Sequence, residues 1–97
     1  MCKSKIFAEI LSVVSIETEV SQEKILSDSK EIEVVDARSI LIHLLKKEGL
    51  YPSEIASFIN KTKRSVNQNI SSFDDRLSGG KIMGIILEKV RKKVGKE

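Results

Sequence analysis

Apolar side chains recur every three or four positions along most of the chain, which is the spacing of one face of an α-helix. The pattern predicts an amphipathic helix over about 4–15, a short helix of about two turns at 21–26 and a central helix over about 30–48. Ser29 is the expected N-cap of the central helix, whose wide apolar arc marks it as buried. The arc consists of Val34, Ala37, Ile40, Leu41, Ile42, Leu44 and Leu45.

Turn-forming residues then predict a pair of helices joined by a tight turn. Gly49 ends the central helix in a left-handed conformation that glycine adopts at little cost. Pro52 suits the first position of a short helix that ends at about Ile59. Asn60 tolerates a left-handed turn, and Thr62 can cap a second helix that begins at Lys63.

The second helix of the pair and a last helix complete the prediction. Gly79 and Gly80 separate the two, and the last helix extends over about 81–94. Inward positions are Val66, Ile70, Phe73 and Leu77 in the first, and Ile82, Ile85, Ile86 and Val90 in the second. No segment alternates with a period of two, so the chain is predicted to be an all-α bundle of five to six helices, with residues 1–97 as a single domain.

Composition excludes several classes of function. The lone Cys2 and the isolated His43 provide no metal site, and no cofactor is expected. Asp74 and Asp75 are adjacent and so point to different faces of a helix, which rules out a catalytic carboxylate pair. Neither an enzyme nor a small-molecule substrate is therefore expected. No apolar run approaches the length of a membrane span, and a cytoplasmic protein is expected.

Charge is divided unevenly along the chain. Residues 1–60 hold seven Lys/Arg and ten Asp/Glu, a balance of −3, whereas residues 61–97 hold ten and four, a balance of +6. A one-sided basic field suits a polyanion such as nucleic acid. The basic residues of the last helix and tail, 81–97, would also suit an anionic membrane, but a small domain needs that helix's apolar stripe for its own core, so membrane contact is not expected.

The start of the helix predicted at Lys63 is the candidate site. Basic side chains lie badly at the positive end of a helix dipole, so Lys61, Lys63 and Arg64 indicate a negative partner, although a solvated helix end is the alternative. In a DNA-reading helix pair, Arg64 could bind a guanine edge, and Asn67 or Gln68 an adenine edge. Lys61, Lys63 and Ser65 would contact the DNA backbone, which positions a protein without reading sequence.

Part of the chain resembles a known family. The segment SKEIEVVDARSILIHLL at 29–45 resembles the C-terminal DNA-binding domain (domain IV) of the bacterial replication initiator DnaA, a helical domain related in fold to the Trp repressor. The resemblance covers roughly 21–73, and it implies that Lys30 reaches into a minor groove. Arg38 of this segment is expected to be structural, paired with an acid such as Glu33 or Glu48.

A second segment, EIASFINKTKRSV at 54–66, is similar to the family's helix pair if one residue is deleted. Thr62 and Lys63 then occupy the positions of the family's base-contacting Asp and His. The resemblance implies a double-stranded DNA-binding domain, sequence-specific and acting in replication initiation or its regulation, with a base preference of its own. The alternative is a protein-interaction module or transcriptional regulator that keeps the fold without the initiator's specificity.

Overall fold

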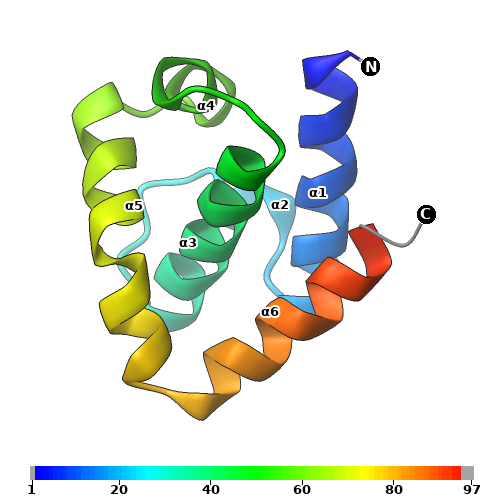
Figure 1. Ribbon diagram of the computed structural model, residues 1–97, viewed down its shortest axis with the longest axis vertical. Helices are drawn as coiled ribbons and strands as arrows, with labels where there is room; N and C mark the ends of the chain where they lie inside the picture. The colour runs from blue at the N-terminus through cyan, green and yellow to red at the C-terminus, as the bar shows by residue number, and fades with distance from the viewer. Residues whose placement is uncertain (1, 95–97) are drawn as a thin grey trace.

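The computed structural model describes residues 2–94, with only the backbone described at positions 81 and 82. Within that range all regular secondary structure is α-helical, which confirms the predicted fold class (Figure 1). The elements are α1 (Lys3–Thr18), α2 (Gln22–Ile25), α3 (Ile32–Lys47), α4 (Pro52–Ile59), α5 (Lys63–Ser78) and α6 (Lys81–Val94).

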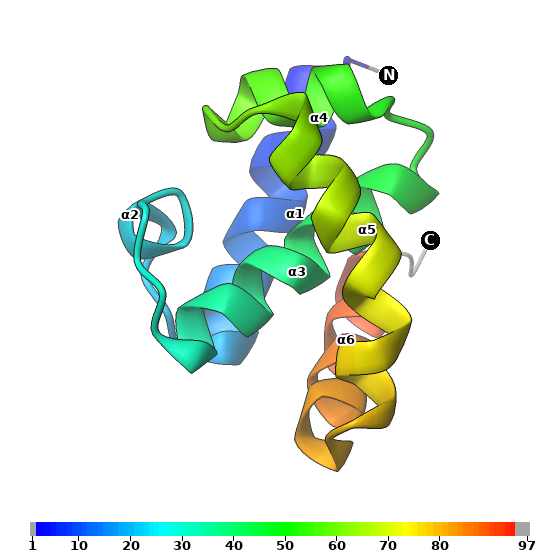
Figure 2. The ribbon, with the colours of Figure 1, turned by 90° about the vertical axis from the view of Figure 1, so that its left-hand side faces the viewer.

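The central helix of the bundle is α3, which lies between α1 and α5 (Figure 1). Its predicted apolar arc is buried in full, and Ile40, Leu41 and Leu45 are completely shielded from solvent. Burial of such side chains is worth about 1.5–3 kcal/mol each, which makes α3 the main source of stability. The other helices pack around it, α2 and α4 near its two ends (Figure 2).

The start of α3 differs from the prediction. Ser29 is not its N-cap: the helix begins at Ile32, and Glu31 occupies the cap position without a side-chain hydrogen bond. The backbone carbonyls of Ile25, Ser27 and Ser29 instead accept hydrogen bonds from the Arg38 side chain. These bonds hold the segment that precedes α3 in a non-helical conformation. The preceding helix, α2, is also shorter than predicted: it has a single turn, where two turns were expected.

The predicted boundaries of α4 and α5 are confirmed. Gly49 has φ of 99° after α3, and Asn60 has φ of 59° and ψ of 45° after α4. Pro52 is the first residue of α4, and the Thr62 hydroxyl accepts a 3.1 Å hydrogen bond from the backbone N–H of Ser65. Each boundary follows from a residue with a strong local preference, so neighbouring structure does not override it.

The inward face of α6 differs in part from the prediction. Val90 is buried as expected and Ile86 is half-buried, but Ile85 is 56% exposed. Met83 and Leu87 are buried in its place, so that the face at positions 83, 87 and 90 packs against α1. Apolar residues surround much of this helix, and such a wide arc does not define which face turns inward. The predicted inward side chain of Ile82 and the tail at 95–97 lie outside the described residues.

Among the described residues, none of the helices combines the length and apolar character needed to cross a membrane.

Candidate nucleic-acid interface

The solvent-facing side of α5 carries four of the residues predicted to bind DNA. Lys63, Arg64, Asn67 and Gln68 line a shallow hollow together with Ser71 and Ser72 (α5 is in front in Figure 2). The opposite side of the helix is fixed in the core by Val66 and Phe73, which are at most 4% exposed. The predicted division of α5 into an apolar and a polar face is therefore correct.

A second hollow adjoins the first and contains the other predicted residues. Lys30, Lys61, Thr62 and Ser65 line it, and Gln68 belongs to both hollows. Residues from the segment before α3, the turn after α4 and the start of α5 thus share one continuous surface. The fold brings all eight predicted residues together, although Lys30 and Lys61 are far apart in the sequence.

Lys63 and Arg64 add two positive charges to this surface. Both side chains are exposed, and none of the ion pairs between described residues includes either of them. They lie in the first turn of α5, which has no acidic residue to offset the positive end of the helix dipole. An anion at this end of the helix would interact favourably with both charges and with the dipole.

Lys61 has a different partner from the expected phosphate. Its ammonium donates a 2.8 Å hydrogen bond to the Ser27 carbonyl and pairs with the Asp28 carboxylate. A second hydrogen bond from Lys61, donated to the Asp28 carboxylate, holds the pKa of Asp28 below its usual value. The Lys61 side chain is only 14% exposed, so its charge is used within the protein. Its role here is to tie the turn after α4 to the segment that carries Lys30.

The Arg38 side chain holds the same segment by hydrogen bonds to its backbone. It is 9% exposed, and it donates to the carbonyls of Ile25 at 2.9 Å, Ser27 at 2.7 Å and Ser29 at 3.3 Å. Burial lowers the pKa of its guanidinium, and the nearby Asp28 opposes that shift. The prediction of a structural role is correct, but backbone carbonyls replace the expected Glu33 or Glu48. Spacing along one helix could not reveal partners in a preceding loop.

A polar contact that the sequence did not predict fixes the rotation of α5. The Ser39 hydroxyl, 1% exposed on α3, donates a 2.8 Å hydrogen bond to Oδ1 of Asn69. The Asn69 amide in turn donates to the Ser65 carbonyl at 3.3 Å. A buried hydrogen bond has a defined direction, so it restricts rotation more than apolar contact does. It holds Asn69 inward and therefore Arg64 and Gln68 outward.

The His43 ring adds a second contact between α3 and α5. It stacks on Phe73 with ring centroids 4.0 Å apart and planes 7° from parallel. Burial lowers the pKa of His43, and the positive charges of Lys47 and Arg91 lower it further, whereas Asp74 acts in the opposite direction. Within residues 2–94, no group of His, Cys, Asp or Glu has the arrangement of a metal site. The ring serves packing.

Acidic residues mark the far end of the α5 surface. Asp74 and Asp75 are exposed, two turns beyond Gln68 on the same helix. Carboxylates repel phosphate, so an approaching nucleic acid would meet attraction at the start of α5 and repulsion at its end. The charge pattern limits the candidate interface to about the first half of the helix.

Comparisons with protein-family models, with curated proteins and with solved structures found no significant match. A functional assignment therefore depends on the chain's own residues and geometry.

Proposed function

We propose that this chain is a double-stranded DNA-binding domain in which α4 and α5 act as a helix-turn-helix. The observation that carries the proposal is the shared surface of the eight residues, with the cations Lys63 and Arg64 at the positive end of α5. Basic side chains, amides and hydroxyls in that combination match the phosphates and base edges of a duplex.

The dimensions of α5 support insertion into a major groove. Residues 63–72 of the helix precede the acidic end and span about 15 Å at 1.5 Å per residue. A helix with its side chains is about 10–12 Å across, and the major groove of B-form DNA is about 12 Å wide. The outward-facing side chains on this part of α5 include Arg64, Asn67 and Gln68.

These three residues would read bases, and their neighbours would hold the DNA backbone. Arg64 suits a guanine edge, and Asn67 or Gln68 suits an adenine edge. Lys63, Thr62 and Ser65 lie at the start of α5, where phosphate contacts would set the register. Lys30, beside the same end, would reach the adjacent minor groove, as the resemblance to the initiator domain implies. A non-enzymatic role in replication initiation or its regulation follows from that resemblance.

Selection of bound duplexes from a random pool, at a stated salt concentration, tests the proposal. We expect enrichment of a short motif that contains a guanine, and we expect Arg64→Ala to relax the preference at that position. Failure to recover duplex above the amount retained by the empty support would contradict DNA binding. Recovery without an enriched motif would contradict the assignment of the three reading residues.

A further inference from the structure

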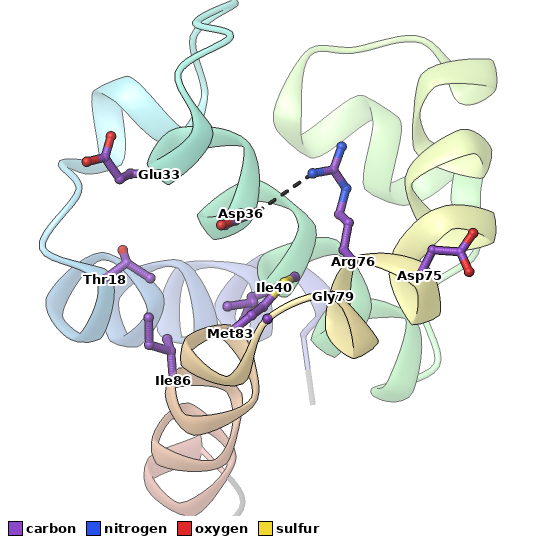
Figure 3. Close-up of a pocket in the computed structure, with 10 residues that line it drawn as sticks. Thr18, Glu33, Asp36, Ile40, Asp75, Arg76, Gly79, Met83 and Ile86 are labelled. Atoms are coloured by element: carbon purple, nitrogen blue, oxygen red, sulfur yellow. Dashed lines mark ion pairs between the residues drawn. The ribbon is translucent and has the colours of Figure 1, made fainter.

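A separate cavity of about 490 Å³ lies where the ends of several helices meet (Figure 3). Its walls come from the end of α1, the first turns of α3, the end of α5 with the following turn, and the start of α6. The volume falls within the range of about 300–1,000 Å³ that is usual for small-molecule sites. The cavity lies at the acidic end of α5, and Arg76 lines both the cavity and the second hollow of the surface proposed to bind DNA.

The inner part of the cavity is apolar. Side chains of Ile40, Met83 and Ile86 come together there from α3 and α6 (Figure 3). Ile86 is half-buried and so keeps surface that a ligand could cover. Met83 has a flexible thioether side chain that can adapt to the shape of an apolar group. An occupant with an apolar body would gain free energy by burial here.

The rim of the cavity is acidic. Glu33 and Asp36 contribute carboxylates from α3, and Arg76 contributes one guanidinium from α5 (Figure 3). Nη1 of Arg76 is 3.7 Å from Oδ1 of Asp36, which is an ion pair but longer than a hydrogen bond. The Asp36 carboxylate is 37% exposed and keeps acceptor positions that a donor from a ligand could occupy.

We propose that this cavity binds a small amphiphilic cation, a primary ammonium group attached to an apolar body. The ammonium would donate to the Asp36 carboxylate, and the body would cover Met83 and Ile86. The Thr18 hydroxyl at the wall donates to the Val14 carbonyl at 2.7 Å, so its oxygen is left as an acceptor. The test of this site does not involve DNA.

An NMR titration of the full chain tests the proposal, with 4-phenylbutylammonium as the probe. Two matched compounds serve as controls: 4-phenylbutanol, which lacks the charge, and 4-phenylbutyrate, which reverses it. We expect saturable shifts of the Gly79 and Gly80 amides, which lie at the cavity wall. The cation should bind about tenfold more tightly than the alcohol, the usual gain from one charge-assisted hydrogen bond.

Two acidic positions provide a matched pair of variants. Asp36→Asn should remove most of the preference for the cation over the alcohol. Asp74→Asn makes the same chemical change at an exposed residue of α5 that does not line the cavity, and it should leave the preference intact. Equal losses from the two variants would mean that only the general field of the protein attracts the probe, and the proposal would be wrong.

The apolar half of the site has its own variant. Ile86→Trp should fill the cavity and abolish the saturable shifts, and the dispersion of the amide spectrum reports whether the variant is folded. Retention of full affinity by folded Ile86→Trp would place the probe elsewhere and overturn the proposal. The absence of saturable shifts in the unmodified chain would also overturn it, as would equal affinity for all three compounds.

Discussion

The Ser39 hydroxyl on α3 and the Asn69 side chain on α5 form a direct 2.8 Å hydrogen bond between the two helices. The bond connects the most buried helix to the helix whose outer face carries Arg64 and Gln68. Ser39 is only 1% exposed, so water cannot readily replace Asn69 as the partner of its hydroxyl. The direction in which α5 presents its candidate DNA-contacting residues therefore depends on a contact made on its inner side.

Removal of this hydrogen bond should reduce stability. We expect Ser39→Ala and Asn69→Ala each to lower the free energy of unfolding by about 1 kcal/mol, because each removes this hydrogen bond. Asn69→Ala also leaves the buried Ser39 hydroxyl without its partner. In the double variant the losses should fall short of additivity by about 0.5–1.5 kcal/mol. Urea denaturation of the four proteins measures this coupling. Strict additivity would show that the two side chains do not stabilise each other.

Lys61 and Lys63 should differ in their effect on DNA binding, although they are two positions apart. Each phosphate contact that is lost changes the slope of log affinity against log salt by about 0.9. Lys63→Met should therefore make the slope shallower by about 0.9. Lys61→Met should leave the slope unchanged, because the Lys61 ammonium already binds Ser27 and Asp28.

Fluorescence anisotropy with a labelled duplex at several salt concentrations provides both slopes. The same loss of slope for Lys61→Met as for Lys63→Met would show that Lys61 leaves Asp28 and contacts phosphate when DNA binds.

Arg64 should contribute to sequence preference. We expect Arg64→Ala to weaken binding by about 1–3 kcal/mol on the selected site and by much less on random duplex. The reason is that a contact with a guanine edge is lost only on the selected site. Lys5→Ala is a suitable control, since Lys5 is exposed on α1, on the other side of α3 from α5 (Figure 1). Equal losses on both duplexes for Arg64→Ala would assign Arg64 to phosphate.

His43 should make stability depend on pH. Burial holds its pKa in the folded state below the ordinary value of 6.5, so folding favours the neutral ring. The unfolded chain then binds more protons between the two pKa values. The contribution of the neutral ring to the free energy of unfolding is fully present above about pH 6.5. It declines as the pH falls from there towards the folded-state pKa.

Thermal denaturation at pH 7.5, 6.5 and 5.5 checks this prediction. The melting temperature of the unmodified chain should fall further over this range than that of His43→Phe. The Phe side chain keeps an aromatic ring against Phe73 but does not titrate. Carboxylates such as Asp28 titrate in both proteins and cancel in the comparison. Identical losses would mean that the His43 ring protonates as easily in the folded state as in the unfolded state.

The boundaries of α4 and α5 were predictable because single residues determine them. Gly49, Pro52, Asn60 and Thr62 each have a local preference that acts within a few positions of the chain. The polar face of α5 was predictable for a related reason, since a narrow stripe at Val66, Ile70, Phe73 and Leu77 leaves only one inward orientation. The gathering of the candidate residues on one surface then follows from the helix pair.

Contacts between distant segments were not predictable. Nothing near Lys61 in the sequence indicates that its partners are Ser27 and Asp28, and nothing near Arg38 indicates three carbonyls of the segment before α3. Ser29 has the local features of an N-cap, but those tertiary hydrogen bonds hold it outside the helix. In α6 the wide apolar arc left the exposure of Ile85 undecided, and packing against α1 decided it.

The central claim is that the start of α5 binds duplex DNA, and the salt dependence of binding tests it most directly. Anisotropy titrations between about 50 and 200 mM salt should show affinity that falls steeply, with a slope near −0.9 for each phosphate neutralised. The double variant Lys63→Gln/Arg64→Gln should bind far more weakly with a shallower slope, while Lys5→Gln should behave like the unmodified chain. No binding at 50 mM salt, a flat salt response, or equal losses from Lys5→Gln and the double variant would contradict the claim.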